Sequence, residues 1–285
     1  MQRKLHPLEG IVAVCALLFV LFVTVGFAQA QDVRKIALRS SSVLVQDADT
    51  GEVVFSKNTD AVVPIASITK LMTAMVTLDS GIDLDEEIVL SREDAVRMKG
   101  SRSRLRTGLS LTRGELLLLA LMASDNRAAA ALGRSYPGGI EAFVDAMNDK
   151  AALLEMEESR FVEPTGLSPA NVSTASDLAK LVRAAHEYPL IREYSTRSRA
   201  TVRASGRTLN YGNTNNLVRS KYWDIELSKT GYISEAGRCL VMQVRLAEKD
   251  LIVVLLDSWG KQSRIGDANR IRKWLESGAA TGRSS

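Results

Sequence analysis

The sequence predicts an α/β protein of the α+β kind, in which strands from both ends of the chain form one sheet around an inserted helical block. Near the N-terminus, two short runs of β-branched and apolar residues, 42–46 and 52–56, flank an Asp-Thr-Gly turn and are typical of a β-hairpin. Towards the C-terminus, three further runs are strand-like: 225–229, 240–246 and 251–256. The segment between them is mostly helical in pattern, and the chain shows no internal repeat and no interdomain linker.

The helices are predicted from apolar spacing and from their capping residues. Apolar side chains recur every three or four positions after Ser67, which predicts a helix with one buried face. Thr112 followed by Glu115 fits a capping box that opens a helix at 113–122. The same reasoning predicts four more helices: 128–133, 140–154, 176–186 and a terminal helix at 265–276.

The N-terminal segment predicts export. Arg3 and Lys4 precede an apolar run at 11–27 that ends in an Ala-Gln-Ala cleavage pattern, so we expect residues 1–30 to be a signal peptide and 31–285 the mature catalytic domain, located in the periplasm. The sheet part of this domain is expected at about 40–90 and 216–278, and the helical part at about 91–200. The apolar run is also long enough to span a bilayer, so an uncleaved anchor stays open. The polar tail at 277–285 has no amphipathic pattern, and we expect at most peripheral membrane association.

Composition argues against several classes of function. The 285 residues, 46% apolar and 25% charged with a formal net charge of +4, describe an ordinary globular protein. The densest basic stretch could meet an anionic partner, but no aromatic residues are interleaved for stacking on bases, so we expect a solvated loop and no nucleic-acid binding: Arg97, Lys99, Arg102, Arg104 and Arg106. Without the signal peptide, His186 and Cys239 are the only histidine and cysteine. We therefore expect no metal site, no cofactor, no intramolecular disulfide, a surface histidine and a core cysteine.

Ser67 and Lys70 form a Ser-x-x-Lys motif at the start of the first predicted helix. Positions i and i+3 share a helical face with Cβ atoms roughly 5–6 Å apart, so the hydroxyl and the amine can hydrogen-bond as nucleophile and base. Free N–H groups at a helix start favour developing negative charge, and apolar neighbours can lower a lysine pKa until the amine is neutral. The alternative is an N-cap serine and an exposed lysine, and the tetrapeptide alone does not decide between them. A second copy at 258–261 follows a strand and contains glycine, which disfavours a helical placement of its lysine.

Two further patterns change the balance. Residues 124–126, Ser-Asp-Asn, fall between two predicted helices, where a hydroxyl can relay a proton and an amide can hold a peptide carbonyl. Residues 229–231, Lys-Thr-Gly, end a predicted strand and present a cation and a hydroxyl to a carboxylate, while the glycine admits an extended substrate to the strand edge. Each pattern is weak alone. The three together, in this order, are the signature of serine β-lactamases and penicillin-binding proteins.

The sequence therefore resembles the low-molecular-mass penicillin-binding proteins, and most closely the periplasmic D-alanyl-D-alanine endopeptidases of Gram-negative bacteria. The resemblance covers about residues 40–278 and includes PIASITKLMTAMV, LLLLALMASDNRAAAAL, RFVEPTGLS, KTGY and GRCLVM. It implies the serine β-lactamase/DD-peptidase-like fold, which is an antiparallel sheet flanked by helices with an all-helical region inserted, and a site in the cleft between the two parts.

The same resemblance implies a role for each motif residue. Ser67 would be the acylated nucleophile and Lys70 its general base, and Ser124 would pass a proton to the leaving amine. The remaining residues would bind substrate: Asn126 a carbonyl, Lys229 and Thr230 the terminal carboxylate, and the backbone N–H groups of Ser67 and Tyr232 the oxyanion.

The implied activity is hydrolysis of D-alanyl-diaminopimelate cross-links in peptidoglycan, a step of cell wall biogenesis and cell shape, with peptidoglycan stem peptides as partners and β-lactams as covalent inhibitors. Three alternatives stay open. A D-alanyl-D-alanine carboxypeptidase shares every motif. A class A-like β-lactamase requires a glutamate followed four residues later by asparagine, whereas Glu163 is followed at that offset by Leu167, so we expect Glu163 to be structural. A non-catalytic peptidoglycan-binding protein would not need Ser67 and Lys70.

Overall fold

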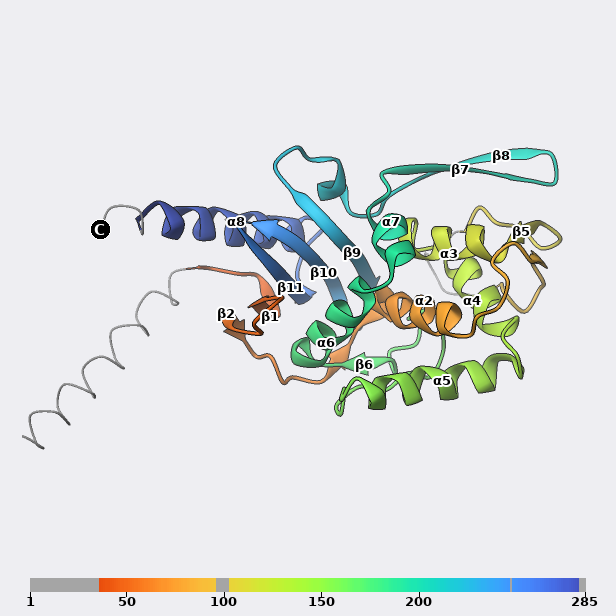
Figure 1. Ribbon diagram of the computed structural model, residues 1–285, viewed down its shortest axis with the longest axis horizontal. Coiled ribbons are helices and arrows are strands. Elements are labelled where there is room, and N and C mark those ends of the chain that lie inside the picture. The colour runs from red at the N-terminus through yellow and green to blue at the C-terminus, as the bar shows by residue number, and fades with distance from the viewer. Residues whose placement is uncertain (1–35, 96–102, 247, 282–285) are drawn as a thin grey trace, which may run out of the picture. The chain divides into compact units, whose positions relative to one another are not determined.

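The computed structural model describes residues 36–95, 103–246 and 248–281 (Figure 1). The expected signal peptide, residues 1–30, lies outside these ranges, as do Arg97, Lys99 and Arg102 of the basic stretch. The strands are β1 (Ser40–Asp47), β2 (Val53–Lys57), β3 (Val63–Pro64), β4 (Glu87–Val89), β5 (Ser110–Thr112), β6 (Val172–Ser173), β7 (Arg199–Ala204), β8 (Arg207–Gly212), β9 (Asp224–Ile233), β10 (Gly237–Leu246) and β11 (Lys249–Ser258). The helices are α2 (Thr69–Asp79), α3 (Arg113–Met122), α4 (Asn126–Arg134), α5 (Gly139–Leu153), α6 (Ala175–His186), α7 (Pro189–Thr196) and α8 (Ser263–Thr281), with 3-10 turns η2 (Ala66–Ile68) and η3 (Asn216–Arg219).

One antiparallel sheet, in the order β2-β1-β11-β10-β9, joins strands from early and late parts of the chain. In the sequence β10 and β11 are almost continuous apolar runs, which is expected when both faces of a strand are covered, because side chains alternate between the faces. Val241 and Val254 belong to the main core, whereas their neighbours Leu240 and Leu255 are buried outside it. Both faces of the sheet are therefore packed.

Different helices cover the two faces. The helix α6 packs on β10 and β11, and its Leu178 and Leu181 belong to the main core together with the helical part of the protein. The helix α8 also packs on β10 and β11, but its Ala268 and Ile271 are buried outside that core. The strand β9 is left at the edge of the sheet, with one side open to an extended ligand.

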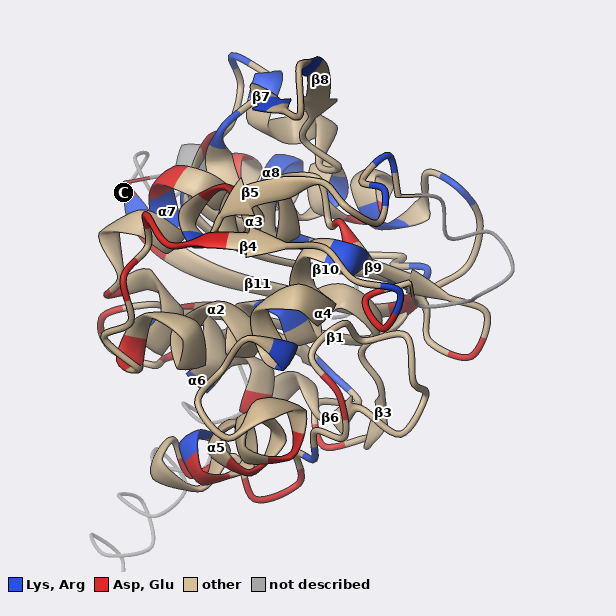
Figure 2. Cartoon of the chain, turned by 90° about the vertical axis from the view of Figure 1, so that its right-hand side faces the viewer, with Lys and Arg blue, Asp and Glu red and all other residues tan. Residues whose placement is uncertain are grey.

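The β7–β8 hairpin projects beside the helical part and carries exposed arginines, Arg199, Arg203 and Arg207 (Figure 2). Its turn residues Ser205 and Gly206 both have positive φ, +47° and +74°, as a two-residue turn of type I′ requires. Neither the hairpin nor α7 has a counterpart among the elements expected from the sequence. The inward positions of β7 are mostly alanine, so the apolar alternation is weak there.

The helix α2 lies at the centre of the helical part and packs against α3, α4, α5 and α6. All its residues from Thr69 to Thr77 are buried, so its polar side chains need internal partners. The Thr69 hydroxyl donates to the Ala66 carbonyl at 2.8 Å, and the Thr73 hydroxyl donates to the Pro164 carbonyl at 2.7 Å. These bonds tie the first turns of α2 to η2 and to the 163–168 loop.

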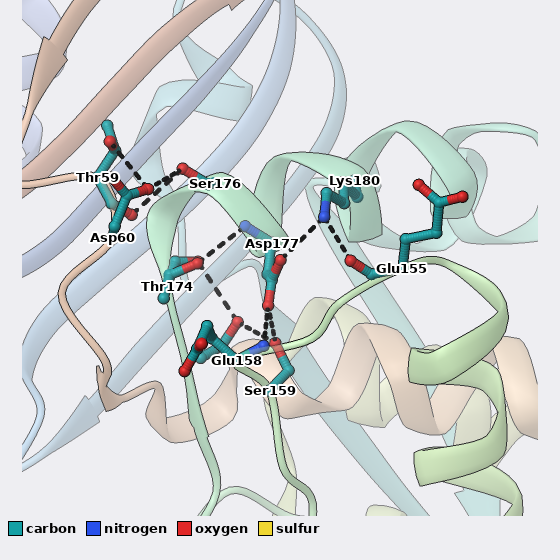
Figure 3. A network of polar contacts seen from close by, with 10 residues as sticks. Thr59, Asp60, Glu155, Glu158, Ser159, Thr174, Ser176, Asp177 and Lys180 are labelled. Atoms are coloured by element: carbon teal, nitrogen blue, oxygen red, sulfur yellow. Dashed lines mark hydrogen bonds and ion pairs between the residues drawn. The ribbon is translucent and has the colours of Figure 1, made fainter.

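A second set of internal bonds fixes the start of α6 (Figure 3). Thr174 caps the helix by accepting a hydrogen bond from the Asp177 N–H at 3.0 Å. The buried Asp177 carboxylate accepts from the Glu158 N–H at 3.0 Å and from the Ser159 hydroxyl at 2.9 Å, and it pairs with the Lys180 ammonium at 3.2 Å. The carboxylate therefore joins α6 to the chain that follows α5.

The sequence predicted the elements that have strong local signals. The capping box of Thr112 and Glu115 is present, and α3 has the predicted bounds. The predicted end of a strand at residue 229 is wrong, because Thr230, Gly231 and Tyr232 continue to pair with β10. The Lys-Thr-Gly motif thus lies within β9. Within the parts of the chain that the structure describes, no helix is long and apolar enough to cross a membrane.

Candidate active site

Ser67 lies in η2, immediately before α2, in a backbone position that close packing enforces. Ala66 has a positive φ of +48°, and two glycines allow the turn to approach its neighbours. A Cβ on Gly166 would lie 2.0 Å from the Ala66 carbonyl oxygen, and a Cβ on Gly231 would lie 3.0 Å from the Ile65 carbonyl oxygen. The sequence assigned Gly231 to the approach of substrate. The structure gives a different reason, which is the packing of η2 against β9.

Lys70 is fully buried one turn after Ser67, and its Nζ donates to three neutral acceptors. The Ser67 Oγ lies at 2.9 Å, the Asn126 Oδ1 lies at 2.7 Å, and the third acceptor is the Thr165 carbonyl. Burial lowers the pKa of Lys70 to about 8, although the negative charges of Glu163 and Asp125 oppose this shift. The exposed-lysine alternative is therefore wrong, and the amine is poised to lose its proton near neutral pH.

The loop at 163–168 presents that third acceptor, and Glu163 holds the loop in shape. Its Oε2 accepts from the Thr165 N–H at 2.7 Å and from the Thr165 hydroxyl at 2.5 Å, while its Oε1 accepts from the Asn171 amide at 3.1 Å. Gly166 follows with a φ of +75°. Glu163 is therefore structural, as the sequence predicted, and its backbone contacts direct the Thr165 carbonyl towards Lys70.

Ser124 lies at the junction of α3 and α4, opposite the strand β9. Its φ of +54° is unusual for a residue other than glycine, and Asp125 caps α4 directly after it by accepting from two backbone N–H groups. The Lys229 Nζ donates to the Ser124 Oγ at 2.8 Å and to the Thr230 carbonyl at 2.8 Å. Burial, together with the positive charges of Lys70 and Arg264, lowers the pKa of Lys229 well below its usual value. The site thus holds two serine–lysine pairs.

A cavity of about 570 Å³ connects these groups with the edge strand. Its lining includes Ser67, Ser124, Asn126, Thr230, Tyr232 and Arg264. The Thr230 hydroxyl donates to the Thr214 hydroxyl at 2.7 Å, and the Arg264 guanidinium donates to the Gly231 carbonyl at 2.8 Å. Tyr232 is 55% exposed, with the Arg238 guanidinium over its ring. Arg264, which lines the cavity from α8, places a positive charge beside β9, and this side of the cavity fits an extended, carboxylate-bearing ligand.

This arrangement has the parts that acyl transfer needs. A nucleophilic hydroxyl bonded to a lysine of lowered pKa can be deprotonated at the moment of attack. A second hydroxyl bonded to another lysine can return a proton to a leaving amine. The backbone N–H groups of Ser67 and Tyr232 stay the predicted donors to an oxyanion, and such donors contribute on the order of 100- to 1000-fold in rate.

The structure brings together every residue that the sequence singled out for the site. The second Ser-x-x-Lys match, at 258–261, takes no part in the site. Ser258 of the second Ser-x-x-Lys lies in β11, where its hydroxyl bonds to Ser40, and Lys261 is exposed. Cys239 is buried as expected, and burial raises the pKa of its thiol to about 11. The side chain of His186 is 21% exposed, and its Nε2 lies 2.7 Å from the Glu226 carboxylate.

Three contributors to the site were not predicted: the Thr165 carbonyl, the Thr214 hydroxyl and Arg264. A backbone carbonyl has no signature of its own in the sequence, although the Pro-Thr-Gly turn marks the place. Thr214 and Arg264 lie in segments without any motif. Among the described residues, no group of histidine, cysteine, aspartate and glutamate side chains is placed to hold a metal ion.

Comparisons with known proteins agree with this geometry. Residues 28–260 match the family described as D-alanyl-D-alanine carboxypeptidase. The chain is 51% identical over 246 residues to a D-alanyl-D-alanine endopeptidase of Pseudomonas aeruginosa, covering 86% of this chain and 79% of the relative. It is 48% identical over 243 residues to a D-alanyl-D-alanine endopeptidase of Escherichia coli, covering 85% of this chain and 78% of the relative. A crystal structure of a Streptomyces DD-transpeptidase superposes with a TM-score of 0.80 at 28% identity, covering 86% of this chain and 100% of that one.

Proposed function

Because the chain belongs to the D-alanyl-D-alanine carboxypeptidase family, whose members are serine DD-peptidases, we propose that it hydrolyses the D-alanyl-diaminopimelate cross-links of peptidoglycan through a Ser67 acyl-enzyme. The endopeptidase assignment is supported by the two relatives of 51% and 48% identity, both of which carry that name. The observation that carries the mechanism is the pair of serine–lysine contacts, Lys70 to Ser67 at 2.9 Å and Lys229 to Ser124 at 2.8 Å.

In the acylation step, neutral Lys70 removes the proton of the Ser67 hydroxyl as its oxygen attacks the D-alanyl carbonyl. The carbonyl oxygen becomes an oxyanion that accepts hydrogen bonds from the backbone N–H groups of Ser67 and Tyr232. When the C–N bond breaks, Ser124 donates a proton to the departing amine and recovers one from Lys229. Thr230 holds the carboxylate of the departing residue and Asn126 holds a carbonyl of the acyl side.

Deacylation runs the same chemistry with water in place of the amine. Before this step the proton that Lys70 took from Ser67 passes to Lys229, which gave its own proton to Ser124, so that Lys70 is neutral again. Lys70 then accepts a proton from water as the water oxygen attacks the ester carbon, and it returns that proton to the Ser67 oxygen as the ester bond breaks. Glu163 does not activate this water, because both of its oxygens accept hydrogen bonds within the 163–171 segment. A β-lactam acyl-enzyme is therefore expected to persist, and β-lactams to act as covalent inhibitors.

We place the enzyme in the periplasm, where cross-linked peptidoglycan is found, with a role in cell wall biogenesis and cell shape. The support for this location is the signal-peptide pattern at residues 1–30. Amino-terminal sequencing of the protein recovered from a periplasmic extract tests it. A mature chain that starts at Gln31 is expected, and retention of Met1 in a membrane fraction would contradict it.

The function is tested with purified mature protein, a fluorescent penicillin and defined muropeptides. We expect a long-lived penicillin label that Ser67→Ala abolishes, and conversion of cross-linked dimers to monomers. Rapid loss of the label would indicate a β-lactamase, and no labelling would indicate a binding protein. Release of D-alanine from monomeric pentapeptides with intact dimers would make the enzyme a carboxypeptidase.

A further inference from the structure

The cavity contains a second pair of side chains, Arg104 and Tyr211, that the mechanism above does not use. The Arg104 guanidinium lies over the Tyr211 ring, with Cζ 4.2 Å from the ring centroid, and its Nη1 donates to the Asn210 carbonyl. Asn210 and Tyr211 belong to β8, so the hairpin holds the guanidinium at the wall of the cavity. Ser103, next to Arg104, also lines the cavity and donates to Asp125 at 2.7 Å.

Both side chains keep hydrogen-bonding capacity for a ligand. A guanidinium has five N–H donors, and no carboxylate within the described ranges forms an ion pair with Arg104. Tyr211 is 5% exposed, and its buried hydroxyl has no hydrogen-bond partner within the same ranges. Burial raises the pKa of Tyr211 to about 12, so the phenol stays protonated and can donate. The negative charge of Asp125 adds to burial in raising the pKa of Tyr211, but its oxygens accept hydrogen bonds from Ser103 and from the first turn of α4, not from Arg104 or Tyr211.

The chain that follows Tyr211 connects the pair with the residues to which the mechanism assigns the leaving group. Gly212 and Thr214 follow Tyr211 along the same wall. Thr214 accepts a hydrogen bond from Thr230, the residue to which the mechanism assigns the carboxylate next to the broken bond. A leaving group larger than one amino acid would extend from Thr230 along this wall towards Arg104.

We propose that Arg104 and Tyr211 form a subsite for a carboxylate of the second stem peptide, the one that departs when a cross-link is cut. This inference rests on the proposed function. A terminal D-alanine ends at Thr230, whereas a cross-linking diamino acid continues into a stem peptide with further carboxylates. A guanidinium binds a carboxylate through two parallel N–H bonds, which gives both affinity and orientation. The subsite selects cross-linked dimers over monomeric pentapeptides.

The test measures binding in the Ser67→Ala background, where the substrate stays intact. Calorimetry with a purified cross-linked dimer and with a monomeric pentapeptide gives the Kd of each. Arg104→Gln is expected to raise the Kd of the dimer about tenfold relative to that of the monomer. Arg203→Gln is the control, because it removes the same charge from the hairpin that carries Tyr211, and Arg203 is not among the residues that line the cavity. It is expected to leave the ratio unchanged.

Tyr211→Phe separates ligand binding from folding. The hydroxyl has no protein partner, so its removal is expected to leave the thermal midpoint unchanged while it weakens dimer binding about threefold. Equal losses for dimer and monomer, or an unchanged ratio in Arg104→Gln, would overturn the subsite. If wild-type protein cleaves dimers and Arg104→Gln leaves the ratio unchanged, only the subsite fails. If wild-type protein releases only terminal D-alanine, the proposed function fails, and the binding ratio still decides the subsite.

Discussion

Lys70 and Asp177 are both buried ionisable side chains, and the protein treats their charges differently. Asp177 accepts two hydrogen bonds and pairs with the Lys180 ammonium at 3.2 Å, so its negative charge has a positive partner (Figure 3). Lys70 donates to a hydroxyl, an amide oxygen and a backbone carbonyl, all of them neutral. The charge in the scaffold has a direct ionic partner, whereas the charge in the site contacts only neutral groups, with the carboxylates of Glu163 and Asp125 acting on it without an ion pair.

The difference shows how one fold supports both stability and reactivity. A buried charge with a direct ionic partner joins segments of the fold, whereas a buried ammonium that contacts only neutral groups loses its proton more readily. The second lysine of the site, Lys229, adds to this, because two nearby buried ammonium groups disfavour each other. Substitutions at the site are therefore expected to change activity far more than stability. Substitutions in the network around Asp177 are expected to change stability far more than activity.

The largest effect is expected for Lys70→Met. Loss of the general base lowers the rate of Ser67 acylation by fluorescent penicillin about 1000-fold. The free energy of unfolding is expected to stay unchanged or to rise, because a buried cation without a carboxylate partner is replaced by an apolar side chain. Stopped-flow acylation and urea unfolding measure the two quantities. A large loss of stability with residual acylation would contradict the comparison.

The pH dependence sharpens the same prediction. The acylation rate of the wild-type protein is expected to rise with pH around pH 8, where Lys70 becomes neutral. This rise in the pH–rate profile is expected to be absent in Lys70→Met. For stability, the folded pKa of Lys70 lies below its unfolded value of 10.5, so between these values the unfolded state binds more protons and stability rises with pH. The difference between wild-type and Lys70→Met unfolding free energies is therefore expected to move in favour of wild type from pH 8 to pH 10.

Gly166→Ala is expected to have the next largest effect. Its Cβ would lie 2.0 Å from the Ala66 carbonyl oxygen and 2.9 Å from the Ser67 nitrogen, so η2 must move. A displacement of about 1 Å at a nucleophile can cost about 100-fold in rate. Gly206→Ala is the control, since Gly206 has a similar φ of +74° and nothing within 4 Å of the added Cβ. The control should lose about 1 kcal/mol of stability and retain acylation. Equal acylation rates in the two variants would contradict the clash.

The sequence predicted the parts of the site that lie in local motifs, but not the contacts between distant segments. The serine, lysine and asparagine positions were predicted because each motif is local and has a chemical reason for its residue types. The contact of Lys70 with the Thr165 carbonyl was not predicted, because it depends on packing between segments that lie 95 residues apart in the sequence. The same holds for Arg104 and Tyr211, which meet only through the β7–β8 hairpin. The strands of the sheet had strong apolar runs, whereas the alanine and arginine pattern of the hairpin left it unassigned.

In the scaffold network, Asp177→Asn is expected to affect stability alone. The new amide NH₂ would face donors, the Glu158 N–H or the Ser159 hydroxyl, and the pairing with Lys180 would be lost. The expected loss is about 2–3 kcal/mol, which corresponds to roughly 5–10 °C in thermal midpoint. Asp60→Asn is the control, because Asp60 is exposed and accepts only surface bonds, from the hydroxyls of Thr59 and Ser176. Acylation of both variants should match wild type at 25 °C, and a loss of acylation in Asp177→Asn would show that the two regions are coupled.

The smallest effect is expected for Glu163→Gln, which joins the two regions because Glu163 both shapes the loop and faces Lys70. Its negative charge raises the pKa of Lys70 against the effect of burial, so removing the charge should lower that pKa further and move the acidic limb of acylation to lower pH. The amide keeps only one of the two accepting oxygens, so the plateau rate should also fall, by less than about tenfold. Glu157→Gln, at an exposed position, is the control. A lower acylation rate at high pH, with no change in the pH at which the rate rises, would contradict this. It would mean that Glu163 acts on Lys70 only through the Thr165 carbonyl and that its charge is fully screened by the loop.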